Sequence, residues 1–332
     1  MTILVTGSSG HLGEALVRTL QAQGRDVIGL DIRPGAVTHR IGSITERDVV
    51  RDAMAGVTVV LHAATLHKPH VATHSRQAFV NVNITGTLNL LEEARAADVT
   101  AFVYTSTTSV FGDALVPPRG EPAAWVTESV SPVPKNIYGV TKAAAEDLCQ
   151  LFARNQALPA IVLRVSRFFP EPDDDAAVRS AYDDSNAKVN EFLHRRVDIE
   201  DVVDAHLKAI AHASTARFAK YIISATTPFS REDMAELRGN APQVVRRIVP
   251  DYVQEYARRG WSMFDGIDRV YVNAKARAEL GWRPRHDFRT LVARLKADED
   301  IRSPLAQAIG SKGYHDRAFG HGPYPVDDAI RA

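Results

Sequence analysis

Short apolar runs alternate with longer, helically spaced apolar patterns through the first 165 residues. The run at 3–5 is followed by Leu12, Leu16 and Leu20, which fall on one face of a helix. The same alternation predicts strands at 27–30, 57–61, 101–105 and 160–165, and helices at 46–54, 86–97 and 139–155. Apolar strands separated by helices indicate a parallel sheet that is covered on both faces and joined by right-handed crossovers. We therefore expect an α/β fold of the Rossmann type, with a doubly wound parallel sheet.

The pattern changes after Pro170. Residues 171–175 are polar, strand-like signals return only at Val197 and at 221–223, and short helices and loops dominate from Pro228 onward. These changes predict a first domain at 1–170 whose sheet is completed by about 196–225, a smaller C-terminal α/β region at 171–195 and 226–300, and a C-terminal tail at 301–332. We expect the tail to be a surface segment, with His315 and His321 exposed.

Composition narrows the class of protein. Forty Lys and Arg balance forty Asp and Glu among 332 residues, so no net charge attracts nucleic acid or an anionic lipid surface. No apolar run reaches the roughly 18 residues of a membrane span, and the first residues do not resemble a signal peptide. The single cysteine, Cys149, cannot form an internal disulfide, and no spacing predicts a metal site. We expect a cytoplasmic protein with no nucleic-acid, membrane or metal partner.

A glycine-rich turn directly follows the first predicted strand and opens the first helix. Gly7 permits a tight turn, Gly10 lets the backbone approach a pyrophosphate, and Gly13 allows close packing of helix on strand. The helix N-terminus then offers amide hydrogens to the phosphates. The second strand ends at Asp31, 24 positions after Gly7, where a carboxylate binds ribose hydroxyls and repels a 2′-phosphate. The turn predicts a dinucleotide site that favours NAD over NADP, although Arg33 leaves NADP open.

Tyr138 and Lys142 stand at positions i and i+4 of a predicted helix and share one face. A phenol has an ordinary pKa of about 10, and nearby cations favour its ionised form. Lowering that pKa by about 3 units corresponds to about 4 kcal/mol. Tyr138 is therefore a candidate acid/base that takes the proton of a substrate hydroxyl while hydride leaves the same carbon.

Five blocks together resemble the extended short-chain dehydrogenase/reductase family, also called the NAD-dependent epimerase/dehydratase family. They are Thr6-Gly7-Ser8-Ser9-Gly10-His11-Leu12-Gly13, Leu61-His62-Ala63-Ala64, Asn83-Ile84-Thr85-Gly86-Thr87, Thr107-Thr108-Ser109-Val110-Phe111-Gly112 and Tyr138-Gly139-Val140-Thr141-Lys142. Two further segments, 196–202 and 278–284, are similar to the family's C-terminal signatures, so the resemblance covers residues 1 to about 295.

The resemblance implies roles for individual residues. Thr107 matches the hydroxyl that holds the substrate oxygen, Tyr138 the acid/base, and Lys142 the residue that lowers the tyrosine pKa and binds the nicotinamide ribose. The expected NAD contacts are Gly7, Ser9, Gly10, His11, Leu12, Asp31, Ile32, Ser43, Ile44, Leu61, Ala63, Ala64, Asn83, Thr105, Tyr138, Lys142 and Val165. Ser43 stands where many members carry an Asp toward the adenine, and His62 matches a structural position.

Departures from the family pattern narrow the reaction. Thr107 is followed by Thr108-Ser109 instead of Asp-Glu, which argues against dehydration. Arg167 replaces the Asn that is usual near a nucleotide diphosphate, and only about 25 residues separate Pro170 from Arg195, which suggests a small substrate. Residues 164–172 also resemble uronate dehydrogenases, in which an arginine is suited to clamp a carboxylate. The expected substrate contacts are His67, Thr107, Thr108, Arg167 and Arg195.

The preferred hypothesis is an NAD-dependent oxidoreductase that acts on a secondary alcohol of a sugar or sugar acid. A nucleotide-sugar epimerase with tightly bound NAD remains the alternative, and a non-catalytic NAD(P)-sensing protein is a third possibility. The acidic residues at 171–184 are expected to form a solvated loop. Helices at 86–97 and 139–155 match those that pair in dimeric relatives, so we expect a homodimer.

Overall fold

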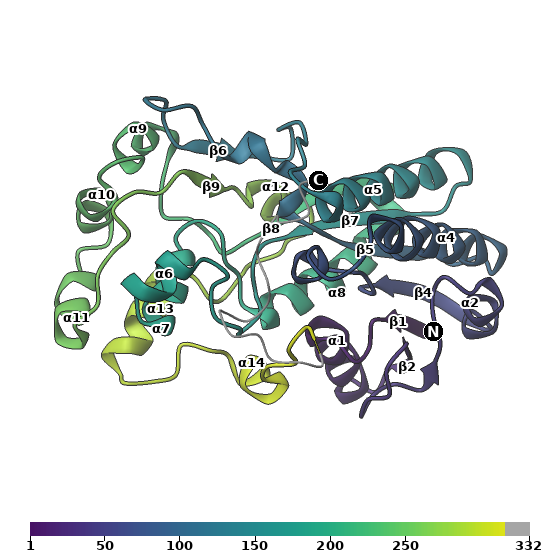
Figure 1. Cartoon of the computed structure of the whole chain (residues 1–332). Coiled ribbons are helices and arrows are strands. Elements are labelled where there is room, and N and C mark those ends of the chain that lie inside the picture. The colour runs from purple at the N-terminus through teal and green to yellow at the C-terminus, as the bar shows by residue number, and fades with distance from the viewer. Residues whose placement is uncertain (316–332) are drawn as a thin grey trace.

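The computed structural model describes residues 1–315. Seven parallel strands form the main sheet in the order β3-β2-β1-β4-β5-β7-β8 (Figure 1). Their bounds are β1 Thr2–Thr6, β2 Asp26–Asp31, β3 Arg40–Ile41, β4 Val57–His62, β5 Ala101–Thr107, β7 Ala160–Val165 and β8 Phe218–Ile223. The predicted Rossmann-type α/β fold is confirmed. The strand order reverses between β1 and β4, and a ligand of such a sheet binds in the crevice at that point.

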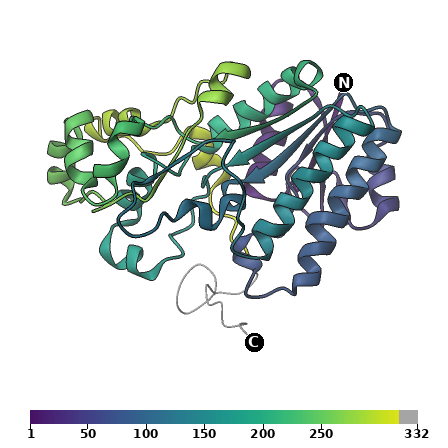
Figure 2. The ribbon, with the colours of Figure 1, turned by 90° about the horizontal axis from the view of Figure 1, so that it is seen from above.

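Helices cover both faces of the sheet, as the near-continuous apolar strands require (Figure 2). One face packs against α1 (His11–Ala22) and α8 (Ile199–Ala216), and the other against α2 (Arg47–Ala53), α4 (Gly86–Ala96) and α5 (Ile137–Asn155). Alternate residues of each strand enter the two cores, so Ile3 and Val5 face α1 while Leu4 faces α2 and α4. A short α3 (Arg76–Phe79) precedes α4.

A second hydrophobic core lies to one side of the sheet. It contains a two-stranded parallel sheet of β6 (Ala124–Val126) and β9 (Arg269–Tyr271). The surrounding helices are α6 Ala176–Ala181, α7 Asp184–Glu191, α9 Met234–Leu237, α10 Ala241–Ile248, α11 Tyr252–Arg259 and α13 Phe288–Lys296. Helix α12 (Ala274–Glu279) packs instead on β8, and its Ala276 belongs to the core of the main sheet. Residues 123–126 join this core from within the first half of the chain, which the sequence pattern does not predict.

The chain returns to the main sheet after the second core. Ser303 caps α14 (Pro304–Ile309), and its hydroxyl bonds Asp198 at the start of α8 at 2.6 Å. Ile309 is buried in the same core as α1. The expectation of a surface tail is therefore wrong for 303–309, because the small apolar face of α14 packs on α1 and α8. The predictions for residues 316–332, including His321, lie outside the described residues.

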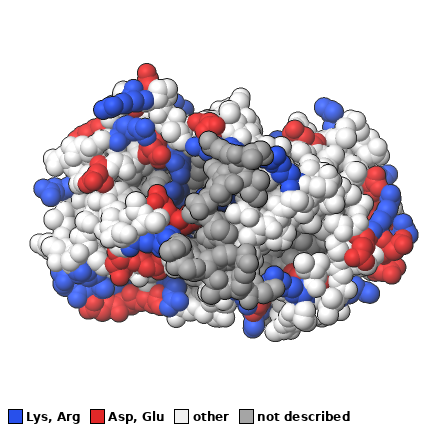
Figure 3. Space-filling model, in the orientation of Figure 1, with Lys and Arg blue, Asp and Glu red and all other residues white. Residues whose placement is uncertain are grey.

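Charged side chains of both signs are mixed over the face shown in Figure 3, in keeping with the balanced composition. None of the helices within residues 1–315 is long and apolar enough to cross a membrane.

Candidate active site

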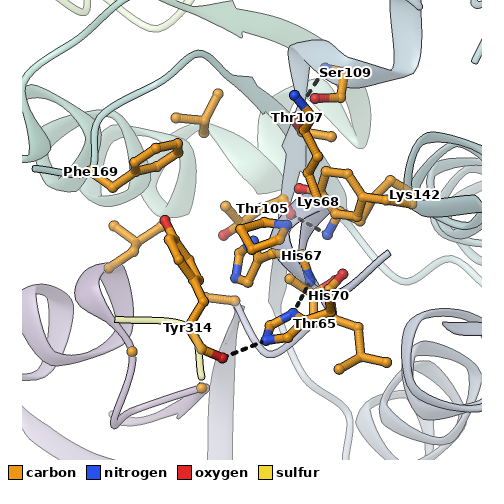
Figure 4. Close-up of a pocket in the computed structure, with 18 of the residues that line it drawn as sticks. Thr65, His67, Lys68, His70, Thr105, Thr107, Ser109, Lys142, Phe169 and Tyr314 are labelled. Carbon is orange, nitrogen blue, oxygen red and sulfur yellow. Dashed lines mark hydrogen bonds between the residues drawn. The ribbon is translucent and has the colours of Figure 1, made fainter. Parts of the chain in front are cut away.

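A cavity of about 750 Å³ opens at the carboxyl ends of the parallel strands. Its walls come from the β1–α1 turn, the segments after β4, β5 and β7, and the first turn of α5 (Figure 4). It coincides with the crevice at the reversal of strand order, where the fold class places its ligand.

The glycine turn is shaped for a phosphate group. Gly7 has φ of +75°, and a Cβ there would lie 2.8 Å from the Ala64 nitrogen. A Cβ at Gly13 would lie 1.9 Å from the Gly7 oxygen, so the helix and strand can approach this closely only without side chains. Helix α1 begins at His11, and no side chain caps its N-terminus. Its first amide groups are thus available to an anion that binds in the turn.

Asp31 marks the adenosine side of the cavity. Its carboxylate accepts hydrogen bonds from the backbone nitrogens of Ser9 and Arg33, both at 2.9 Å. These bonds hold the glycine turn against the end of β2 and leave further lone pairs for ribose hydroxyls. Ile32, Ser43 and Ile44 line the same end of the cavity. The residues at this end therefore fit the adenosine half of a dinucleotide.

Thr107, Tyr138 and Lys142 lie together at the other end. Thr107 ends β5, and its hydroxyl accepts a hydrogen bond from the Ser109 nitrogen at 3.1 Å. Tyr138 occupies the first turn of α5, which Asn136 caps, and Lys142 follows one turn later. The Lys142 ammonium donates to the Thr105 carbonyl at 2.6 Å. Tyr138 and Lys142 are 6% and 1% exposed, so both groups are shielded from bulk water.

Burial sets the acid–base state of this pair. It raises the pKa of Tyr138 to about 12, although a hydrogen bond with Thr107 opposes the rise. Burial also lowers the pKa of Lys142 to about 7, against the charge of Glu146. The shift of the Tyr138 pKa comes from burial and from the Thr107 hydrogen bond, and a positive charge next to the phenol would favour the phenolate.

His67 borders the reaction centre. Its ring centroid lies 6.0 Å from that of Tyr138, and burial lowers its pKa to about 3, so the imidazole is neutral. The neighbouring His70 accepts the His67 backbone N–H through Nδ1 at 2.9 Å. His62, in contrast, bonds Thr6 and Thr87 in the core, which confirms its structural reading.

The two predicted arginine contacts line the cavity but are engaged in ion pairs. Arg167 pairs with Asp173, with Asp174 at 2.7 Å and with Glu191 at 2.9 Å. Arg195 pairs with Glu191 at 2.8 Å and with Asp173 at 3.3 Å. The guanidinium groups thus hold the segment after β7 through these ion pairs, and the role of either arginine in binding a substrate carboxylate stays a prediction.

The same ion pairs correct a second expectation. Glu171, Asp173 and Asp174 are between 6% and 9% exposed, so the expectation of a solvated loop is wrong for these three residues. Asp175, Asp183 and Asp184 are exposed, as expected. The first three carboxylates are buried because basic side chains of neighbouring segments neutralise them. A buried carboxylate without such a partner would be strongly unfavourable.

Asp198, Glu200 and His286 bring possible metal ligands within 4.8 Å of one another, although the sequence spacing predicts no metal site. Asp198 accepts from the Glu200 nitrogen and from Ser303, and Glu200 pairs with His286 at 2.9 Å. These bonds join α8 to α14 and to the segment before α13, so the three side chains have a structural role.

Most of the predicted site residues meet in the cavity. The lining includes Gly7, Ser9, Gly10, His11, Leu12, Asp31, Ile32, Ser43, Ile44, Ala63, Ala64, His67, Thr105, Thr107, Thr108, Tyr138, Lys142, Val165, Arg167 and Arg195. Leu61 and Asn83 are buried behind it. Asn83 Oδ1 accepts from the Leu66 nitrogen at 2.8 Å, so Asn83 positions the segment after β4.

Sequence reasoning missed part of the wall. Phe169 and residues 312–315 line the cavity, although the latter lie some 170 residues further along the chain than Lys142. Residues 310–315 carry no helical or strand periodicity, so the pattern gives no signal for their place.

The model of the NAD dependent epimerase/dehydratase family matches residues 3–223. The chain belongs to this family. Members are NAD-dependent enzymes, and the glycine turn, Asp31 and the Tyr138–Lys142 pair fit NAD as the cofactor.

The similarity to known proteins also covers residues outside 3–223. A UDP-glucose 4-epimerase of Lactobacillus helveticus is 24% identical over 86% of this chain and 93% of its own length. A 3-beta-hydroxysteroid dehydrogenase of Mycolicibacterium neoaurum is 26% identical over 85% of this chain and 87% of its own. The fold is shared with a short-chain dehydrogenase/reductase superfamily protein of Agrobacterium tumefaciens that holds bound NAD, at a TM-score of 0.64, 24% identity and coverage of 90% and 97%.

Shorter matches show higher identity. Sterol demethylase protein B of Methylococcus capsulatus is 38% identical over 44% of this chain and 45% of its own length. The chain spans about half the length of these more identical curated relatives. The relatives differ in the reactions that their names describe. The comparisons therefore show the family but do not select one reaction.

Proposed function

We propose that the protein transfers hydride between a secondary alcohol of a sugar or sugar acid and NAD. The observation that carries this proposal is the meeting of Thr107, Tyr138 and Lys142 at one end of a cavity whose other end holds the glycine turn and Asp31. NAD supplies the hydride acceptor when it is bound. The chain's own residues supply the shielded acid/base and the orientation of the reacting oxygen.

In the forward direction, the Thr107 hydroxyl bonds the substrate oxygen and Tyr138 removes its proton. The carbon that bears this oxygen then loses hydride to NAD, and the alcohol becomes a ketone. The Tyr138 pKa of about 12 must fall for this step, and the positive charge of an oxidised nicotinamide next to the phenol favours that fall. Lys142, held on the Thr105 carbonyl, is placed to bind ribose hydroxyls beside the phenol.

The cavity favours a small, hydroxyl-rich substrate. His67 and Thr108 offer polar groups near Thr107, while Arg167 and Arg195 are paired with acidic side chains. A sugar acid would have to displace one of these pairs, so a neutral sugar suits the described arrangement better. Segment 171–195 forms only two short helices, α6 and α7, which agrees with a small substrate.

A nucleotide-sugar epimerase is the second candidate. It is favoured by the likeness to UDP-glucose 4-epimerase over 86% of the chain. Thr107, Tyr138 and Lys142 would serve that reaction equally, because epimerisation begins with the same oxidation and returns the hydride to the opposite face.

We further propose that the protein is a homodimer. Val140 and Leu151 on α5 are 48% and 39% exposed, which is high for large apolar side chains. They lie on the helix that pairs between subunits in the relatives of the family.

The deciding experiment mixes the protein and NAD with separate panels of free sugars, sugar acids and nucleotide sugars and follows NADH absorbance. Net NADH with a free sugar or sugar acid supports the dehydrogenase. A new isomer of a nucleotide sugar by NMR, without net NADH, would replace it with the epimerase.

A further inference from the structure

Residues 311–315 form a segment, here called the strap, that follows α14 and crosses the N-terminal end of α1 (Figure 1). Lys312, Gly313, Tyr314 and His315 all line the same cavity as the glycine turn. The strap thus brings residues 312–315 to the predicted dinucleotide site.

A single buried carboxylate anchors the strap. Oε1 of Glu171 accepts hydrogen bonds from the Ser311 hydroxyl at 2.7 Å and from the backbone nitrogens of Lys312 and Gly313 at 3.2 Å. The same oxygen bonds His11 Nε2 at 2.9 Å. Glu171 is 6% exposed, so these donors take the place of water at Oε1 and tie the strap to the segment after β7.

The strap is also fixed to the helix that receives the phosphates. The Lys312 ammonium pairs with Glu14 in the first turn of α1. His11, which bonds the strap's anchor, is the first residue of that helix, and its backbone belongs to the phosphate turn. A shift of the strap therefore acts on the turn through two side chains.

Tyr314 lines the cavity and lies beside rings from three neighbouring segments. Its ring lies 6.0 Å from that of His11, 6.1 Å from that of His67 and 5.8 Å from that of Phe169 (Figure 4). These three residues follow β1, β4 and β7, the strands whose ends form the binding crevice. The Tyr314 carbonyl meets His70 Nε2 at 3.0 Å, which closes the same side.

We propose that the strap is part of the NAD site, and that Tyr314 covers the cofactor between the phosphate turn and the reaction centre. NAD then enters and leaves only when the strap moves away from Glu171. The strap excludes water from the hydride-transfer region and slows cofactor exchange. This inference rests on NAD as the cofactor and is independent of the substrate.

The test compares two truncations of the full chain. One ends at Gly310 and lacks the strap, and the matched control ends at His315 and keeps it. NADH dissociation is followed by stopped-flow fluorescence, and Kd by titration, without any sugar present. We expect the Gly310 truncation to release NADH at least about tenfold faster and to bind it about tenfold more weakly, equivalent to about 1.4 kcal/mol. The control should match the full chain.

Point variants separate the strap from any general loss of folding. Tyr314→Ala and Glu171→Gln should both speed NADH release, and Tyr314→Phe should recover most of the loss caused by alanine because it keeps the ring. Thermal unfolding of each variant reports whether it folds.

Three results would overturn the proposal. They are unchanged NADH release in the Gly310 truncation and in Tyr314→Ala, equal acceleration in both truncations, and tighter NADH binding without the strap, which would mean that Tyr314 competes with the cofactor. A lack of turnover with every sugar would defeat the proposed function but would leave these measurements standing.

Discussion

Tyr138 and Lys142 lie one turn apart on α5, and burial moves their pKa values in opposite directions, to about 12 and to about 7. A tyrosine with a pKa of about 12 is a proton donor at neutral pH, and it becomes a base only when positive charge arrives beside it. NAD binding would bring that charge, so we expect the Tyr138 phenol to act as a base only in the complex with NAD.

The first prediction follows from that role. Tyr138→Phe should bind NADH as the wild type does and lose turnover by about 10²- to 10⁴-fold, since the ring remains and the acid/base group is removed. Tyr104→Phe is the matched control, because the Tyr104 hydroxyl is buried without a hydrogen-bond partner among the described residues. Equal turnover in wild type and Tyr138→Phe would remove the proposed mechanism.

The Lys142 pKa predicts a pH-dependent stability. Its folded pKa of about 7 lies below the ordinary value of 10.5, so between these values the unfolded chain binds more protons than the folded one. The free energy of unfolding then rises with pH across this window, and below about pH 7 the full cost of the buried charge is present.

Lys142→Met should be more stable than wild type near neutral pH, with a gain that shrinks as the pH approaches about 10. Denaturant unfolding of both proteins without cofactor, at several pH values, measures the difference. A stability difference that does not change with pH would show that Lys142 is not held with a lowered pKa.

At the residue level, the sequence predicts those parts of the site whose chemistry requires particular residues at a fixed short spacing. Gly7, Gly10 and Gly13 and the Tyr138–Lys142 spacing each encode their geometry over a few positions. Arg167 shows the limit, because its role depends on Asp173, Asp174 and Glu191. Two of these follow closely in sequence, but the burial that pairs them with the arginine is a tertiary property.

At the level of elements, Asn83 shows how a helical turn positions the segment that follows β4. It lies in the π-helical turn at Val80–Thr85, and its amide bonds Leu66 and Thr141. The resemblance predicts Asn83 at the cofactor, and the structure places it one layer behind. It sets the segment after β4, whose Ala63 and Ala64 face the cavity.

Asn83→Ala should therefore weaken NADH binding indirectly and lower stability by about 1–3 kcal/mol, because its partners lose buried hydrogen bonds. Asn186→Ala is the control, since Asn186 is equally buried and bonds the Ser262 backbone in the second core. Isothermal titration and denaturant unfolding of both variants separate the effects. A comparable loss of NADH affinity in Asn186→Ala would contradict a specific role for Asn83.

At the scale of the whole molecule, the alternation of apolar strands and helices was sufficient to predict the doubly wound sheet, because each strand is buried on both faces. The same reasoning could not predict that 123–126 would join the second core or that α14 would return to α1. Such long-range contacts depend on surfaces that exist only after the sheet has formed. The packing of α14 on α1 also brings the strap to the predicted cofactor site.

The exposed face of α5 leads to the last prediction, about assembly. Val140 and Leu151 lie about three turns apart on one face of α5 and leave apolar area in water, which a second copy of α5 would cover. Leu151→Arg should shift the protein from dimer to monomer, because two guanidinium groups would meet across a symmetric contact. Multi-angle light scattering measures the mass of each species. Glu299→Arg, a charge change at an exposed residue just after α13, should leave the mass unchanged. A wild-type protein that is monomeric at the concentrations where it is active would exclude this interface, and a Leu151→Arg dimer would place it elsewhere.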